Sequence, residues 1–450
     1  MLEISLLEAA QTRLQDSPLR NALSAFYMES GRKGSGFVEF THKSFSEFLC
    51  AERLKEAIED WSKGGDRRRE FYVPTEQMDW EIYDLLGYGG LTIEIVQYLL
   101  ILLTDLLSTE AASILFERLQ RFYFRWCKGE FIDATPENLP QKKMRLLREQ
   151  IKNHRDLNSL GQRQLDIYTG LNIMILLLEL QSYISRKGNL DNDCIFHPCG
   201  QLNTDTFNEF QLLQIMGYSD CIDIGTCVDI IGPFLNSTDL SHSNLSVADF
   251  RGANLNSSNL QFSDLRSADL SSADLSNADL SYTDLRRANF SNTNFQSAKL
   301  IDADLRGTDI KTANLANSDL EGSNLSGADF RGSNLEGANF NSADLRGAYL
   351  KEVNLVDTSF IGSRLNRSDL RLTNLQQANL SSADLRGADL RGADLRGANL
   401  ENAKLVRTNL MNVIWNELTN WPSSQELELA VNVPESLKLR LKNLGGKDER

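Results

Sequence analysis

Large apolar residues recur at every fifth position from Leu240 to Leu410. All 35 of these positions hold Leu, Phe or Ile. Two residues before each lies Ala, Ser or Thr, with Val353 as the exception, and Asp or Asn usually lies between them. This period fits neither an α-helix nor a flat strand, whose apolar positions recur every 3.6 and every two residues. It predicts a coiled solenoid in which each short segment points one large and one small side chain inward.

The repeating unit is small, polar, apolar, x, x, as in Ala383-Asp384-Leu385-Arg386-Gly387. It resembles the A(D/N)LXX motif of the pentapeptide-repeat family over residues 235–415. The resemblance implies a right-handed, four-sided β-helix with four pentapeptides in each coil. About nine coils spaced ~4.8 Å apart would form a rod of ~40 Å. A disordered low-complexity tract is the weaker alternative, because such tracts lack a regularly spaced apolar set.

Sorting the repeats in steps of 20 residues assigns each pentapeptide to one of four faces. The face centred on Leu245 and Leu265, which we call the basic face, carries ten basic residues against five Asp, a net charge of +5, whereas the other three carry −5, −1 and −3. The candidate partner-binding residues are the arginines of two columns on the basic face: Arg266, Arg286, Arg306, Arg346 and Arg386, and then Arg287, Arg367 and Arg407.

Two interpretations of these arginines are open. A row of Asp lies two residues before the first column, at Asp264, Asp284, Asp304, Asp344 and Asp384. The two rows can neutralise each other on a solvated surface, or the arginines can form a binding strip for an anionic partner.

Residues 1–64 predict a winged-helix-like unit. Apolar spacing indicates a helix up to about Met28, followed by a Gly-rich turn, an extended segment over 37–40 and a helix that begins near Ser44 with a Ser44/Glu47 capping box.

Residues 40–48 resemble the end of the NACHT module of STAND-type signalling ATPases. The pattern F-x-H-x-(S/T)-F-x-E-(Y/F) is matched by Phe40, His42, Ser44, Phe45, Glu47 and Phe48. The resemblance implies a packing role for His42. A NACHT ATPase also needs a GxxxxGK(S/T) phosphate loop and a magnesium-binding acidic residue, and this chain has neither motif. We therefore expect the non-catalytic portion of a larger or split NACHT protein, with no enzyme activity and no cofactor.

Helical apolar spacing continues at 77–86, 91–107, 110–128, 136–157 and 161–187, which predicts an α-helical linker domain over 65–228. The longest apolar run, 93–107, is interrupted by Glu94, Gln97 and Asp105, so we expect a core helix and no membrane span. Apolar and polar residues alternate over 221–234, which predicts β-structure. At the other end Trp415 takes the next central position, Trp421-Pro422 ends the period, and a short helix from Pro434 to Leu444 is predicted.

Cys194, His197 and Cys199, with Cys221 and Cys227 nearby, have a metal-like composition. Their spacing does not match the usual zinc doublets, so we expect buried thiols and no metal. A zinc site and a Cys/His nucleophile remain as alternatives.

The chain has 450 residues, 24% of them charged, and a net charge of −15, which indicates a soluble protein and disfavours nucleic acid and membrane surfaces as partners. Six scattered Cys and the lack of a signal peptide predict a cytoplasmic location.

The fold class expected is α+β multidomain: a winged-helix-like end of a NACHT-type module (1–64), an α-helical linker domain (65–228), a pentapeptide-repeat right-handed β-helix (229–415), and a C-terminal helical cap and tail (416–450). The first function hypothesis is a non-catalytic protein–protein interaction scaffold or sensor arm of a NACHT/STAND-like signalling protein, with an unknown protein partner. The alternative is a DNA mimic that acts on a type II topoisomerase, but mimicry needs a strongly negative rod, which the basic face interrupts.

Overall fold

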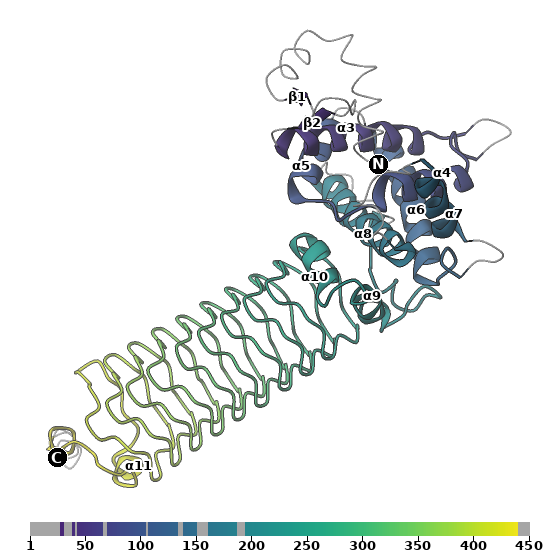
Figure 1. Ribbon diagram of the computed structural model, residues 1–450. Helices are drawn as coiled ribbons and strands as arrows, with labels where there is room; N and C mark the ends of the chain where they lie inside the picture. Colours follow the sequence, from purple (N-terminus) through teal and green to yellow (C-terminus); the bar gives the residue numbers. More distant parts are fainter. Residues whose placement is uncertain are drawn as a thin grey trace. The chain divides into compact units, whose positions relative to one another are not determined.

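The computed structural model describes residues 28–30, 38–40, 43–65, 70–104, 107–133, 138–150, 161–186 and 194–439. The chain divides into a helical unit, Met1–Phe196 with Tyr218–Phe234, and a solenoid unit, His197–Gly217 with Leu235–Arg450. Both are drawn in Figure 1. The predicted first helix, the Gly-rich turn and His42 lie outside the described residues, apart from Met28 and Ser30.

The first described element of the helical unit is a hairpin, in which β1 (Met28–Ser30) pairs antiparallel with β2 (Val38–Phe40). In the described parts of residues 43–186 the helices are α3 (Lys43–Trp61), α4 (Thr75–Leu86), α5 (Ile93–Leu103), α6 (Thr109–Cys127), α7 (Leu139–Gln150) and α8 (Gln162–Arg186). The last five fall on the five segments predicted from apolar spacing. Helix α3 begins at Lys43, one residue before the predicted cap Ser44.

Helix α8 is the central element of this unit and contacts α4, α6, α7 and α10 (Thr226–Ile231). By length and composition it is the one candidate membrane span among the described residues, but 72% of its apolar window is buried. Gly170 explains how closely α6 approaches it: a Cβ at this position would lie 2.0 Å from the indole of Trp126. A helix like α8, with buried side chains on all sides, is typical of the core of a helical domain.

A buried carboxylate connects three helices of the unit. Asp166 on α8 is 2% exposed and accepts hydrogen bonds from the Tyr83 hydroxyl of α4, the Trp126 indole of α6 at 3.1 Å and the Tyr218 hydroxyl at 3.1 Å. Desolvation raises the pKa of Asp166, and the three hydrogen bonds oppose that shift.

The predicted β-structure at 221–234 was wrong. Residues Thr226–Ile231 form α10, and a short 3₁₀ helix covers Gly232–Phe234. Gly225 precedes α10 with a φ of 87°, a conformation that suits glycine, and Cys227, Val228 and Ile231 are buried on one side of the turn. The alternating residues before Gly225 therefore do not continue as a strand.

The solenoid completes one coil every 20 residues (Figure 1). Isolated parallel bridges join the polar position of each pentapeptide to its counterpart in the next coil; the first four are Asp239–Asn259, Asn244–Asp264, Asp249–Asp269 and Asn254–Asp274. All 35 central side chains from Leu240 to Leu410 are 0% exposed, so the predicted core is confirmed. The residue two places after each central side chain has a positive φ, which turns the chain at each corner.

The five-residue period changes before Trp421, whereas the sequence predicted that it would end at Trp421. Ile414 still pairs with Asp394, which keeps Trp415 in phase. The Trp415 side chain is only half-buried. Asn399 then pairs with Asn420, so one extra residue has entered the coil. Beyond it lie α11 (Ser424–Glu428), which was not predicted, and helical backbone at 435–439, within the predicted range 434–444.

Candidate functional site

Asp–Arg pairs within single pentapeptides recur on the surface of the solenoid. In each pair the Asp side chain accepts the backbone N–H two residues later and also binds that residue's guanidinium. For Asp264 and Arg266 the three contacts are 3.1 Å to the backbone N, 2.8 Å to Nε and 2.5 Å to Nη2. Ten such pairs occur: 249/251, 264/266, 284/286, 304/306, 329/331, 344/346, 369/371, 384/386, 389/391 and 394/396.

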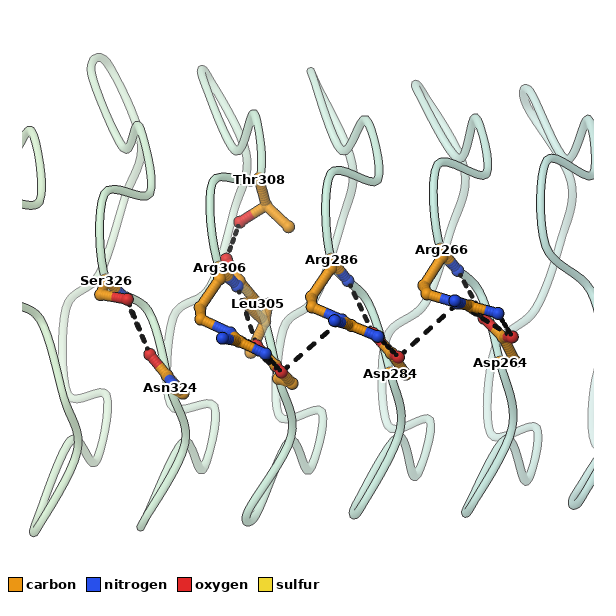
Figure 2. A network of polar contacts seen from close by, with 10 residues as sticks. Asp264, Arg266, Asp284, Arg286, Leu305, Arg306, Thr308, Asn324 and Ser326 are labelled. Atoms are coloured by element: carbon orange, nitrogen blue, oxygen red, sulfur yellow. Dashed lines mark hydrogen bonds and ion pairs between the residues drawn. The ribbon is translucent and has the colours of Figure 1, made fainter.

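Successive pairs on the basic face also contact each other (Figure 2). Arg266 Nε lies 3.7 Å from Asp284 Oδ2, and Arg286 Nε lies 3.8 Å from Asp304 Oδ2. Positive and negative groups therefore alternate along the axis. In this stretch the arginines of the first column are largely neutralised by their own face.

The paired arginines shift the acidity of their partners. The guanidinium of Arg266 lowers the pKa of Asp264, and that of Arg386 lowers the pKa of Asp384 to about 2. The same direction holds for Asp249, Asp304, Asp329, Asp344, Asp369 and Asp394.

We expect acid to destabilise the solenoid between pH ~4 and ~2. Because the folded-state pKa values lie below the unfolded value of ~3.9, the unfolded chain binds more protons in this window, and stability is lost as the pH falls. The pairs are mostly exposed, so added salt should weaken the effect. Urea midpoints measured by circular dichroism across this range test it. A midpoint that stays constant down to pH ~2 contradicts it.

A matched control is available within the same column. Coil residues Asn324 and Ser326 occupy the positions of an Asp–Arg pair, and their side chains are hydrogen-bonded at 2.9 Å (Figure 2). Replacing Asp264 with Asn together with Arg266 with Ser should therefore preserve the fold and reduce the acid dependence.

The eight arginines predicted as partner-binding residues fall into two groups. Arg266, Arg286, Arg306, Arg346 and Arg386 are all members of Asp–Arg pairs. Arg287, Arg367 and Arg407 lie at corner positions with φ of 61°, 58° and 60° and are exposed. Within residues 194–439 none of these three makes a hydrogen bond or an ion pair through its side chain.

Two further cations on the basic face were not among the candidates. Arg364 and Lys404 occupy the column that elsewhere holds Asp or Asn, and both are exposed. A basic residue at the polar position of the repeat, as in Ser363-Arg364-Leu365, is the sequence feature that distinguishes them.

The Cys/His cluster is held by contacts within the protein. Cys199 is buried and its sulfur lies 3.2 Å from the Ser243 hydroxyl, while burial raises its pKa. His197 Nδ1 lies 3.2 Å from Asp239. Cys194 is buried, with Sγ 3.5 Å from the Ser113 hydroxyl. Among the described residues no group of three or more His, Cys, Asp or Glu could hold a metal ion.

Cys221 is exposed, whereas Cys227 is buried in α10, where desolvation raises its pKa to about 12. A thiol with a raised pKa is a poor nucleophile at neutral pH.

The solenoid also carries an aromatic stack that was not predicted from the sequence. His242, Phe262 and Tyr282 are related by 20 residues, and their ring centroids are 5.0 and 4.9 Å apart with nearly parallel planes. Phe262 and Tyr282 remain 50% and 51% exposed. The signal in the sequence is three aromatic corner residues in one column.

The helical unit contains an open hollow of about 390 Å³ beside α3 and α4. Its charged residues are Arg53, Glu56, Glu59, Asp60, Lys63, Glu81 and Asp84. Among the described residues that line it there is no Ser, Cys or His.

Comparison with known proteins identifies the solenoid. Residues 235–271, 273–311, 313–352, 338–377 and 373–412 match the family described as pentapeptide repeats, in eight copies. No curated protein sequence gives a significant match to the chain.

Solved structures with similarity to this chain include pentapeptide repeat proteins. HetL, a pentapeptide repeat protein involved in heterocyst differentiation regulation in the cyanobacterium Nostoc sp. strain PCC 7120, is 30% identical over 42% of this chain and 88% of its own, with a TM-score of 0.22. QnrB1, a plasmid-mediated fluoroquinolone resistance protein, is 20% identical over 43% and 97%, with a TM-score of 0.26. Rfr23, from the cyanobacterium Cyanothece 51142, is 27% identical over 27% and 90%, with a TM-score of 0.14.

Proposed function

We propose that this chain, whose residues 235–412 are pentapeptide repeats, is a non-catalytic scaffold for protein–protein interaction. The observation that supports it most is the uninterrupted core: 35 central side chains with no exposure hold every coil in register. Surface side chains in each column are thereby fixed about 4.8 Å apart along the axis, which is the spacing of paired strands. A rigid surface of this kind loses little conformational entropy on binding.

The finer proposal places this scaffold as the sensor arm of a NACHT/STAND-like signalling protein. It rests on the pattern at residues 40–48 and is compatible with a hairpin directly before helix α3. In such a protein the helical unit would connect the solenoid to nucleotide-binding machinery, and the candidate arginines of the basic face would contact the partner. A DNA mimic acting on a type II topoisomerase is the weaker proposal, because the basic face interrupts any continuous negative surface.

The test is capture of a protein partner by the full chain from extract of its source cell, followed by reconstitution from purified components. We expect a stoichiometric complex that survives gel filtration. A variant with all eight candidate arginines replaced, by Ser in the first column and Gly in the corner column, should weaken it at least ~tenfold. Circular dichroism must show that the variant is folded.

Two outcomes would contradict the scaffold proposal. One is that no partner reconstitutes with the wild-type chain. The other is that the purified chain turns over a substrate on its own.

A further inference from the structure

The charges of the basic face are unevenly distributed once the Asp–Arg pairs are removed from the count. Its ten basic residues include the five paired arginines, which leaves Arg287 and four residues confined to the coils between 364 and 407. We call the four residues Arg364, Arg367, Lys404 and Arg407 the terminal basic cluster. The net positive charge of the face is therefore concentrated near one end of the repeat.

The cluster has the form of two cation pairs, separated by one coil. Arg364 and Lys404 lie in the polar column on either side of Asp384, and Arg367 and Arg407 lie in the corner column on either side of Gly387. Two coil spacings separate the pairs by ~9.6 Å, which is close to the Debye length of ~8 Å at physiological salt. At this separation salt largely screens one pair from the other, so only a ligand long enough to contact both pairs can engage all four charges.

Three carboxylates near the cluster already have donors; one is Glu426, which accepts the backbone N–H of Leu405 at 3.1 Å. Asp384 is bound by Arg386 at 2.8 Å and 2.6 Å, which neutralises the acid at the centre of the cluster. Arg364 Nη1 lies 3.9 Å from Asp344, but that carboxylate is bound by Arg346 at 2.7 Å. Within residues 194–439 Arg367, Lys404 and Arg407 have no side-chain hydrogen bond or ion pair.

The corner residue at the centre of the cluster is a glycine, Gly387. Gly387 has a φ of 71°, and a Cβ there would meet only the Arg367 side chain, with its Cγ at 3.6 Å. The Arg367 stem therefore extends over Gly387, towards the coil of Arg407. In this column Arg367 and Arg407 are separated by a residue without a side chain.

We propose that the terminal basic cluster is a docking site for an extended acidic segment of a protein partner. This inference rests on the scaffold function proposed above and names where the partner binds. The small size of the cluster favours a peptide segment over nucleic acid or membrane, because the neighbouring faces carry net charges of −5 and −1 and would repel an extended polyanion.

The spacing suggests a suitable probe. In a polyproline II helix, residues three apart lie on the same side and ~9.3 Å apart, which is close to the ~9.6 Å between the cation pairs. A fluorescent peptide of five Glu-Pro-Pro repeats presents carboxylates at this interval. We expect the full chain to bind it in an anisotropy titration, with affinity that falls as salt increases.

The cluster variant copies residues that the same columns already contain. Arg364→Asn and Lys404→Asn repeat Asn244 and Asn324, while Arg367→Gly and Arg407→Gly repeat Gly347 and Gly387. These substitutions suit the local backbone, since both corner positions have positive φ. We expect peptide affinity to fall at least ~tenfold.

The control variant removes the same total charge from another face. Arg251, Lys311, Arg331 and Arg371 are each paired with an Asp two residues earlier, and their column contains Ser271 and Ser291. Changing all four to Ser should alter peptide affinity by no more than ~twofold.

Three results would overturn the docking site: the wild-type chain does not bind the peptide, the two variants lose affinity equally, or duplex DNA or vesicles containing phosphatidylserine bind the cluster more tightly than the peptide. If the wild-type chain still forms the complex with its protein partner in these cases, the docking site fails while the scaffold function stands. If that complex also fails to form, the scaffold function itself is contradicted.

Discussion

Replacing Phe340 with Ala should lower the free energy of unfolding of the solenoid by about 3–5 kcal/mol, because it leaves a cavity in a close-packed core. The ring is 0% exposed, stacks on Phe360 with centroids 5.2 Å apart, and meets the edge of Phe330 at 6.1 Å. In a solenoid each coil contacts only its neighbours, so no distant element can fill the space. Urea unfolding of the full chain, followed by circular dichroism, measures the loss.

The control is an aromatic residue in a stack that is not buried. Phe262 lies between His242 and Tyr282 but is 50% exposed, so Phe262→Ala should cost only about 0.5–1.5 kcal/mol. Equal losses for the two variants would mean that stacking between coils, and not burial, dominates the stability of the solenoid.

The core of the solenoid could be predicted because the residues that determine each turn lie within a single pentapeptide. One central residue, one small residue and one corner residue are specified within five positions, and the coil repeats them without reference to distant segments. The helices of residues 75–186 were found for a similar reason, since their apolar spacing is local. The prediction of β-structure for residues 221–234 was wrong because a short alternation of apolar and polar residues also fits a helical turn with one buried side.

The candidate binding surface was harder to predict from the sequence. The rows of Arg and Asp were visible, but whether they neutralise each other depends on side-chain geometry, such as the 2.8 Å contact between Arg266 Nε and Asp264. The geometry also separates Arg367 and Arg407 from the paired arginines of the neighbouring column. Which cations are available to a partner thus follows from contacts that single positions do not reveal.

Long-range polar networks could not be predicted at all. The donors to Asp166 come from Tyr83, Trp126 and Tyr218, which are 83, 40 and 52 residues away in sequence. No periodic pattern connects them, and a lone Asp in an apolar helix gives no indication of its partners.

Removal of this carboxylate should be the most damaging polar substitution in the helical unit. Asp166→Ala leaves the Tyr83 and Tyr218 hydroxyls without their acceptor, while the Trp126 indole keeps its 3.1 Å hydrogen bond to the backbone oxygen of residue 166. The buried Tyr83 hydroxyl costs ~1–3 kcal/mol when left unpaired, whereas the half-buried Tyr218 hydroxyl costs less because water can reach it. The lost side-chain volume adds to this, so we expect a total loss of about 2–5 kcal/mol. Urea unfolding followed by tryptophan fluorescence measures it.

Asp166→Asn separates the hydrogen bonds from the charge. It retains one acceptor oxygen and should cost only about 1–2 kcal/mol at neutral pH. Because burial raises the folded-state pKa of Asp166, the folded wild-type chain holds its proton to higher pH than the unfolded chain, and its stability falls as the pH rises from ~3.9 through that raised pKa. The Asn variant lacks this dependence, so the difference between the two should narrow with rising pH. If Asp166→Ala is no worse than Asp166→Asn at every pH, the carboxylate does not organise the contact of α4, α6 and α8.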